Sequence, residues 1–473
     1  MVSNSCKHHN GVDMKKNNNY NMGINIGFDA DGVLFDTEYF QLSSKVASYM
    51  KRHFGLDAVN INGYGIKDVF ACSENIEMKF WTRHIFYYSL LFRARPGAGE
   101  TINELKRQGN KVFIVTSKAC ALEKNYKKVV VRLLFRLSLL LNGIHVDGIE
   151  YCSLTNSAQD KLKACRRKNI RVMVEDKKEN IKRLSEELFV LCFDSRNNQG
   201  EYNSNTFRVH NFDEVYANIQ RHIGDITNKS NVFTQFTFKS QKEKKILNDT
   251  EKEKYYEWLK NYYSQLPFNK KHIASSENII NHLNRIYVPF FYLKYKPIII
   301  GTENVIYKKG IIFVCNHLCD KDLFLLLYGL YGNGIYWHPL AKKEVLFKKI
   351  GFLFNLAYSV FVDRSNSSSR HSATQEMAKL LVNGFNVLIF PEGTYNKTNE
   401  LLKEFSGVSH VYLSQILQKP IVNCALTKDY KSRPVLMLDK PYVVPRKLDI
   451  GEAAKDSFLR LSALVEKTKK YQF

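Results

Sequence analysis

Short apolar runs that end in polar or charged residues recur along the whole chain. They cover residues 24–28, 111–115 and 171–174 in the first half, and residues 310–315 and 387–390 in the second half. Runs of this length and composition predict strands that are buried within a sheet. Helix-like stretches separate the strands of the first half. That alternation predicts an α/β fold with a doubly wound parallel sheet.

Two stretches of the first half show helical periodicity. Residues 38–92 are aromatic and helix-like, and they separate the first two predicted strands. We expect them to form a small helical cap that closes over a site and selects its substrate. Residues 129–141 come nearest to the composition of a membrane span, but Arg132 and Arg136 interrupt the apolar run. That stretch therefore predicts an amphipathic helix.

The second half begins with two predicted amphipathic helices, at residues 251–263 and 277–293. The second of them ends in an aromatic run at residues 286–292, where Pro289 is expected to kink or end the helix. Aromatic side chains with nearby cations suit a bilayer interface. The same side chains suit a protein core equally well.

Composition adds a preference for an anionic partner. The chain has 473 residues, a formal net charge of +24 and 44% hydrophobic residues. This length predicts two or more domains, and the charge suggests nucleic acid, a phospholipid surface or phosphorylated substrates. No zinc finger, arginine-rich arm or RNA-binding signature occurs. We therefore expect a phospholipid membrane surface and no nucleic acid as partner, unless the charge is mostly a solvated face. The sequence predicts no oligomeric state.

The expected boundaries follow from shifts in composition. They are a disordered tail at 1–21, a first domain at 22–221 with its cap at 38–92, a polar linker at 222–250 and a second domain at 251–473. The tail has no apolar core of a signal peptide, and the nine cysteines show no regular spacing. We expect reduced thiols and a cytoplasmic protein that lies peripherally on the inner face of the cell membrane.

The first candidate chemistry follows the strand at residues 24–28. Asp29 and Asp31 lie two residues apart at the strand end, and Gly32 allows a sharp turn. Such a pair suits phosphoryl transfer, in which one carboxylate attacks phosphorus and the other serves as general acid and base. A calcium-like acidic loop or a plain turn would have the same residues.

Later residues favour phosphoryl transfer. The strand at 111–115 ends in Thr116, Lys161 begins a helix-like stretch, and the strand at 171–174 ends in Glu175 and Asp176. This order resembles the haloacid dehalogenase-like (HAD) phosphohydrolases over residues 22–215. The resemblance implies the following roles: Asp29 as nucleophile, Asp31 as general acid and base, Thr116 and Lys161 as phosphate-binding residues, and Asp29, Asp31, Glu175 and Asp176 as the Mg²⁺ site. Glu175 stands where Asp is commoner.

The second candidate chemistry follows the strand at residues 310–315. His317 comes just after it, and Asp322 lies five residues further on. If Asp320 caps a helix there, the Asp322 carboxylate can reach the imidazole, fix its tautomer and leave the other ring nitrogen free to take a proton. Taken alone, such a pair is more often a capping or surface pair.

Three later blocks support the catalytic interpretation. Arg364 follows an apolar strand, Glu392, Gly393 and Thr394 follow the strand at 387–390, and an apolar run begins at Pro420. Residues about 285–450 resemble the glycerolipid acyltransferase family, which implies an α/β acyltransferase domain. By that resemblance His317 is the base, Asp322 orients it, and Arg364, Glu392, Gly393 and Thr394 bind the acceptor. Tyr395 replaces the family's usual Arg, and Lys397 lies close enough to substitute for it.

Together the two resemblances predict a bifunctional enzyme of phospholipid metabolism. One half would transfer an acyl group from acyl-CoA or acyl carrier protein to a lysophosphatidate-like or other phosphate-bearing acceptor. The other half would be a Mg²⁺-dependent phosphatase. Two alternatives stay open for the HAD half: an unrelated soluble substrate such as a nucleotide or sugar phosphate, and a non-catalytic regulatory role. The acyltransferase half could also use a non-standard acceptor.

Overall fold

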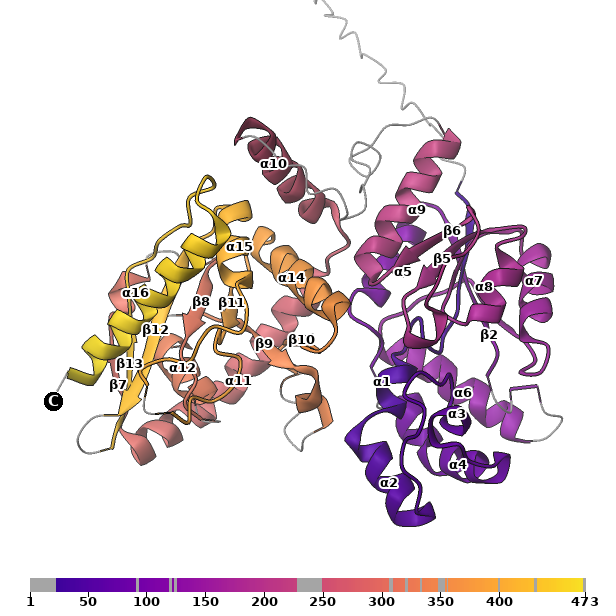
Figure 1. Ribbon diagram of the computed structural model, residues 1–473, viewed down its shortest axis with the longest axis horizontal. Coiled ribbons are helices and arrows are strands. Elements are labelled where there is room, and N and C mark those ends of the chain that lie inside the picture. The colour runs from indigo at the N-terminus through magenta and orange to yellow at the C-terminus, as the bar shows by residue number, and fades with distance from the viewer. Residues whose placement is uncertain are drawn as a thin grey trace, which may run out of the picture.

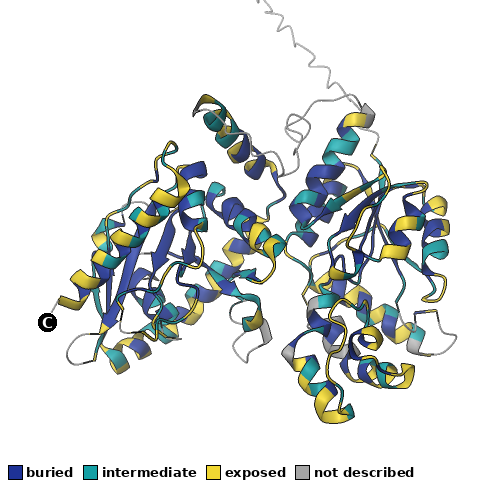
Figure 2. Ribbon diagram, viewed as in Figure 1, coloured by how far each residue is buried: buried dark blue, intermediate teal, exposed yellow. Residues whose placement is uncertain are grey.

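The chain forms two α/β domains that lie beside each other (Figure 1). The computed structural model describes residues 23–90, 93–118, 121–122, 126–227, 249–305, 309–319, 322–331, 334–347, 354, 356–398, 400–428 and 432–470. Each domain is built on its own sheet, and Figure 2 shows the strands of both sheets largely in the colour of buried residues. The expectation of two α/β domains is confirmed.

The first domain, residues 23–227, contains a six-stranded sheet with the order β3-β2-β1-β4-β5-β6, and all its neighbouring strands are parallel. Its strands are β1 (Asn25–Phe28), β2 (Lys111–Thr116), β3 (Gly148–Tyr151), β4 (Ile170–Glu175), β5 (Phe189–Phe193) and β6 (Thr206–Val209). The helices outside the cap are α5 (Ala98–Arg107), α6 (Tyr126–Leu141), α7 (Ser157–Arg167), α8 (Lys178–Leu184) and α9 (Phe212–Thr227). Because β1 lies between β2 and β4, the residues that follow these three strands meet at one edge of the sheet.

The predicted cap is helical. It contains α1 (Thr37–Gln41), α2 (Ser44–Phe54), α3 (Ile66–Phe70) and α4 (Glu74–Leu90). Phe40 packs α1 against α4, since its ring lies 6.4 Å from that of Phe80 and 5.3 Å from that of Tyr88 on α4. Aromatic packing of this kind gives a small helical unit its own core.

The second domain, residues 249–470, has a seven-stranded sheet with the order β10-β9-β11-β8-β12-β13-β7. Its strands are β7 (Ile298–Ile300), β8 (Ile312–Cys315), β9 (His338–Lys342), β10 (Val360–Val362), β11 (Val387–Ile389), β12 (Ile421–Lys428) and β13 (Pro434–Leu438). Its helices are α10 (Asp249–Gln265), α11 (Lys270–Tyr295), α12 (Asp322–Tyr331), α14 (Ser367–Val382), α15 (Ser409–Leu417) and α16 (Ile450–Lys470). Only the β12–β13 pair is antiparallel among the described strands.

Helix α11 differs from its expected form in two ways. It begins at Lys270 rather than 277, and it continues past Pro289 to Tyr295. Side chains on both sides of the proline pack onto α12, with Tyr287 against Phe324 and Phe291 against Tyr328. Because this packing stabilises the helix before and after Pro289, tertiary contacts outweigh the helix-breaking tendency of the residue.

The expected linker is shorter than 222–250 in the structure. Helix α9 extends to Thr227 and α10 begins at Asp249, so both ends of the expected linker are helical. Residues 228–248 and the expected disordered tail lie outside the described residues. None of the described helices is both long enough and apolar enough to cross a bilayer.

Polar contacts join the two domains. Lys379 on α14 pairs with Asp213 on α9 at 2.9 Å, and the Asn211 side chain donates to the Gln375 side chain at 2.7 Å. Lys343, just after β9, pairs with Asp36 in the loop that follows Gly32. The last contact links the second domain to the loop that carries Asp29 and Asp31.

Candidate active sites

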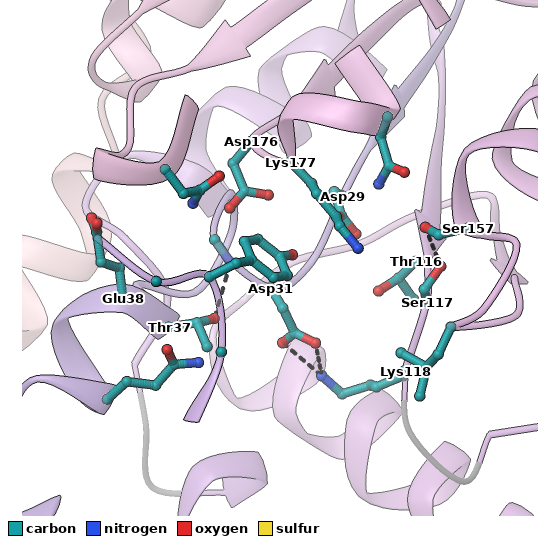
Figure 3. Close-up of a pocket in the computed structure, with 18 of the residues that line it drawn as sticks. Asp29, Asp31, Thr37, Glu38, Thr116, Ser117, Lys118, Ser157, Asp176 and Lys177 are labelled. Carbon is teal, nitrogen blue, oxygen red and sulfur yellow. Dashed lines mark hydrogen bonds and ion pairs between the residues drawn. The ribbon is translucent and has the colours of Figure 1, made fainter. Parts of the chain in front are cut away.

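The first candidate site lies at the carboxyl edge of the six-stranded sheet (Figure 3). The Asp29 backbone N–H donates to the Val174 carbonyl at 2.9 Å, which fixes the residue between β1 and β4. Its side chain is buried, and Oδ2 accepts a 2.6 Å hydrogen bond from Lys161 Nζ. The same ammonium donates to Glu175 Oε2 at 2.7 Å. Lys161 therefore bridges two carboxylates from adjacent strands.

Three buried carboxylates form a group that fits a metal ion. Asp29, Glu175 and Asp176 each offer an oxygen, and these oxygens lie within 4.8 Å of one another. Asp176 Oδ1 is buried and has no hydrogen-bond partner among the described residues. Oxygen-only ligands at this spacing suit Mg²⁺. Glycine is required beside them, because a Cβ on Gly32 (φ +86°) would lie 1.8 Å from Asp176 Oδ2.

The electrostatics of this group favour a bound cation. Burial raises the pKa of Asp29 to about 7, against the opposing effect of Lys161. Burial also raises the pKa of Asp176 well above its usual value, and the charges of Glu175 and Asp29 raise it further. Buried carboxylates that repel one another are each harder to ionise. A divalent cation held by these residues would remove that repulsion and polarise a phosphoryl oxygen.

Asp31 lies outside the three-carboxylate group. Its Oδ1 accepts hydrogen bonds from Lys118 Nζ at 2.8 Å and from the Tyr88 hydroxyl at 2.9 Å. Lys118 also reaches Oδ2 at 3.0 Å, as the dashed lines of Figure 3 show. The side chain of Asp31 therefore faces the cavity from the side of the cap, whereas Asp29 is held on the side of the sheet.

Thr116 ends β2 beside Asp29. It is buried, and its hydroxyl oxygen has no partner among the described residues. Next to it, the hydroxyls of Ser117 and Ser157 share a 2.8 Å hydrogen bond. All three hydroxyls line the cavity with Lys161. Because a buried hydroxyl normally finds a partner, the free oxygen of Thr116 indicates a polar ligand such as phosphate.

Sequence reasoning missed the residues that complete the cavity. The cavity has a volume of about 230 Å³, and Tyr64, Trp81 and Tyr88 of the cap line it together with Lys118 and Ser157. Lys118 had a signal, since it follows Thr116 by two residues at a strand end. The cap residues had none, because only the packing of the cap selects which of its many aromatic side chains face the site.

The second candidate site lies at the carboxyl edge of the seven-stranded sheet. His317 follows β8, and its Nδ1 lies 2.9 Å from Asp322 Oδ2. The same oxygen accepts the backbone N–H groups of Leu318 at 2.6 Å and Cys319 at 2.9 Å. Asp322 is the first residue of α12, whereas Asp320, the expected cap, lies outside the described residues. In the tautomer that donates Nδ1–H to this carboxylate, Nε2 is available to accept a proton.

Glu392 fixes the backbone of His317 from the neighbouring strand. It follows β11, which pairs in parallel with β8, so both residues emerge at the same sheet edge. Glu392 Oε1 accepts the His317 backbone N–H and Oε2 that of Lys403, each at 2.8 Å. Burial raises the pKa of Glu392, and the two N–H groups oppose that shift. Glu392 thus orients the loop that carries His317.

Aromatic rings enclose the imidazole. The ring of Phe390 stacks on His317 with a centroid distance of 4.1 Å, and the ring of Tyr395 lies at 4.4 Å. Tyr395, which replaces the family's usual Arg, therefore lies beside the imidazole of His317.

Arg364 is brought to the Glu392–Thr394 turn. Its Nη1 donates to the Gly393 carbonyl, and a Cβ on Gly393 (φ +73°) would lie 2.5 Å from that nitrogen. Burial lowers the pKa of Arg364, but a guanidinium stays charged at neutral pH. Lys403, which we had not singled out, donates to Thr394 Oγ1 at 3.1 Å, whereas Lys397 is exposed. Cations from two segments thus meet at this turn.

Comparison with known proteins supports the identity of the second domain. Residues 296–427 match the family model described as Acyltransferase. We call residues 249–470 the acyltransferase domain from this match. The chain is 37% identical over 118 residues to a 1-acyl-sn-glycerol-3-phosphate acyltransferase of Cocos nucifera, covering 24% of this chain and 37% of the relative. It is 33% identical over 113 residues to the alpha form of that enzyme from Homo sapiens, covering 24% of this chain and 38% of the relative.

The chain thus spans under two thirds of the length of these curated relatives. Among solved structures, the acyltransferase domain is similar to the 1-acyl-sn-glycerophosphate acyltransferase PlsC of Thermotoga maritima, with 18% identity, 46% of this chain and 90% of that chain covered, and a TM-score of 0.35. A D,D-heptose 1.7-bisphosphate phosphatase from B. bronchiseptica is similar at 14% identity, with 42% of this chain and 99% of that chain covered and a TM-score of 0.27. We call residues 23–227 the HAD-like domain from their motif order and parallel sheet.

Proposed function

We propose that the acyltransferase domain transfers an acyl group from acyl-CoA or acyl carrier protein to the hydroxyl of a lysophosphatidate-like acceptor. The observation that carries this proposal is the 2.9 Å contact between His317 Nδ1 and Asp322 Oδ2. As the acceptor oxygen attacks the thioester carbonyl, Nε2 takes the hydroxyl proton. When the C–S bond breaks, the same nitrogen returns the proton to the leaving thiolate.

The acceptor phosphate would bind where Arg364 and Lys403 meet the Glu392–Thr394 turn. A guanidinium and an ammonium offer the charge-assisted donors that phosphate prefers. Glu392 is committed to two backbone N–H groups, so its role is to hold the turn and the base rather than to touch the acceptor. This arrangement supports a phosphorylated acceptor even though Tyr395 replaces the family's usual Arg.

We also propose that the HAD-like domain is a Mg²⁺-dependent phosphatase acting on a phosphate ester. Asp29 would attack phosphorus, and Asp31, held over the cavity by Lys118 and Tyr88, would protonate the leaving oxygen and then activate water. Thr116 and Lys161 would bind phosphoryl oxygens. Asp29, Glu175 and Asp176 would hold the cation, whose positive charge offsets the negative charge of the phosphoryl oxygens.

The size of the cavity is compatible with both substrate classes considered for this domain. A cavity of about 230 Å³ is small for an organic ligand, so it suits the phosphate end of a substrate or a compact soluble ester such as a sugar phosphate. Phosphatidate and a sugar phosphate, each assayed with Mg²⁺, would distinguish a lipid role from a soluble one. Release of phosphate from neither, with wild type and Asp29→Asn behaving alike, would favour a non-catalytic role.

The proposed partner of the acyltransferase domain is a phospholipid surface on the inner face of the cell membrane. Ile286, Phe290 and Leu293 are exposed along one face of α11, near Arg285 and Lys294. Apolar side chains with adjacent cations suit a bilayer interface. Phe291 and Tyr287, in contrast, pack into the core. Some side chains of the aromatic run thus belong to the protein core, and others are exposed and available to a bilayer.

The acyl transfer is tested with purified protein, lysophosphatidate and acyl-CoA. We expect phosphatidate from wild type and a loss of about 10²–10⁴-fold in His317→Ala, the size of effect typical for a general base. A matched control is His145→Ala, because His145 is exposed and lies in the other domain. Phosphatidate formation by His317→Ala at the wild-type rate would rule the proposal out.

A further inference from the structure

Helix α6 of the HAD-like domain carries an apolar stripe on its outer face. Val129, Leu133 and Leu140 are 67%, 64% and 61% exposed. The other exposed apolar residues of this helix are Tyr126, Val130, Leu137 and Leu141. Steps of three and four residues place all of them on one side of an α-helix. We call this set the α6 stripe.

The opposite side of α6 already has its partner in the fold. Val131, Phe135 and Leu139 are buried, and the Phe135 ring lies 6.5 Å from that of Phe35 and 6.4 Å from that of Tyr151. The core is therefore complete without the stripe. A helix that is apolar on two faces, with only one face buried in the domain, indicates a second apolar or interfacial environment.

The charges of α6 indicate which environment this is. The sequence of the helix contains four cationic residues, Lys127, Lys128, Arg132 and Arg136, and no acidic residue. Arg93 lies at its end and donates to the Leu141 carbonyl at 3.2 Å. Arg132 donates to the Ala121 carbonyl at 2.9 Å, whereas Arg136 is exposed beside Leu133 and Leu140. A second copy of the chain would meet another helix without acidic residues, whereas anionic lipid headgroups would neutralise Arg136.

We propose that the α6 stripe docks the HAD-like domain on an anionic bilayer surface, with its leucine and valine side chains in the interfacial region and Arg136 at the headgroups. This site is separate from the exposed face of α11 in the acyltransferase domain. Each domain thus has its own contact with the lipid surface.

The docked helix lies close to the phosphatase cavity. Lys118, which pairs with Asp31, has its ammonium 4.7 Å from the centre of the Phe135 ring on the inner face of α6. Leu154 lines the cavity and is itself exposed. Docking through α6 therefore brings the cavity close to lipid-borne phosphate monoesters. This consequence for the substrate rests on the proposed phosphatase function, whereas the docking does not.

The test uses the full chain and vesicles of phosphatidylcholine and phosphatidylglycerol in equal parts. Leu133→Gln/Leu140→Gln is expected to lower the partition coefficient by about tenfold for each leucine removed, the loss that follows from one apolar side chain left in water. Leu459→Gln on α16 is the matched control, because that leucine is similarly exposed but lies on another helix. Its vesicle binding is expected to equal that of wild type.

Two further measurements keep the proposal falsifiable. Vesicles should slow amide hydrogen exchange in residues 126–141 of wild type, and Arg136→Gln should weaken binding to anionic vesicles while leaving binding to pure phosphatidylcholine unchanged. Unchanged exchange in α6, or vesicle binding by the double leucine variant equal to wild type, would overturn the proposal. So would a wild-type dimer that the double variant converts to a monomer, because a second copy would then cover the stripe. Hydrolysis of a soluble phosphate ester, measured alongside, reports the phosphatase separately.

Discussion

Lys379 of the acyltransferase domain donates a 2.9 Å hydrogen bond to Asp213 of the HAD-like domain, and both side chains are buried at the junction between the domains. Lys379 also pairs with Glu376 one helical turn earlier, at 2.8 Å. One ammonium therefore compensates two carboxylates. Burial raises the pKa of Asp213 to about 6 despite this pairing, so its ionised form depends on the lysine.

Removal of that ammonium should loosen the junction. Lys379→Met leaves Asp213 and Glu376 buried without a counter-charge, and we expect a loss of about 3–5 kcal/mol in the free energy of unfolding. Urea unfolding followed by circular dichroism measures it. Lys455→Met, at an exposed position on α16, is the control and should change stability by less than about 0.5 kcal/mol. An equal effect of the two substitutions would show that the junction contributes nothing to stability.

Arg364 is expected to determine affinity for a phosphorylated acceptor. Arg364→Ala should raise KM for lysophosphatidate by about tenfold or more, because a charge-assisted phosphate contact is lost. Initial rates at varied acceptor concentration test this. Monoacylglycerol, which lacks the phosphate, is the matched control, and its KM should not change. A rise in both KM values would instead assign Arg364 to the structure of the Gly393 turn.

The three-carboxylate group should destabilise the metal-free protein, because its buried charges repel one another, and it should bind Mg²⁺. Without Mg²⁺, Asp176→Asn removes one of the repelling buried charges, so we expect the variant to be about 1–2 kcal/mol more stable than wild type. With Mg²⁺ in excess, wild type should gain thermal stability and the variant should gain much less. Thermal unfolding with EDTA and with Mg²⁺ makes the comparison. A less stable variant under both conditions would contradict a metal role for Asp176.

His410 should make the acyltransferase domain sensitive to acid. It is fully buried, its Nε2 lies 3.1 Å from Ser457 Oγ, and burial lowers its pKa from 6.5 to about 3. Below pH 6.5 the unfolded chain binds a proton that the folded chain excludes, so the folded state loses stability as the pH falls toward 3. The expected slope is about 1.4 kcal/mol per pH unit. In urea titrations across this pH range, His410→Gln should lack this contribution to the slope. Equal slopes of the free energy of unfolding against pH for wild type and variant would refute the assignment.

The sequence predicted the strands better than the surroundings of the sites. Residues 24–28, 111–115 and 387–390 are mostly apolar, with Asn25 and Lys111 as the polar exceptions, so each was recognisable as a buried strand, and β1, β2 and β11 fall there. Parallel strands end at one sheet edge, and Asp29 meets Glu175 there, as the HAD resemblance implied. His317 meets Glu392 in the same way, a contact that the sequence analysis did not predict.

Other features depend on packing between distant segments. The pairing of Asp31 with Lys118 and Tyr88 depends on where the cap sits, and no local pattern encodes that position. Pro289 lies inside α11 because neighbouring aromatic residues hold the helix against α12. The extent of the linker was overestimated because residues 222–227 are polar enough to resemble a loop, yet they complete α9.

The central claim is that this chain carries two separate active sites, and reciprocal inactivation tests it most directly. One purified protein is assayed for phosphatidate formation from lysophosphatidate and acyl-CoA, and for Mg²⁺-dependent phosphate release from a phosphate ester. We predict that His317→Ala loses the first activity and keeps the second, and that Asp29→Asn does the reverse. Loss of both activities in either variant, or of neither in both, would contradict the claim.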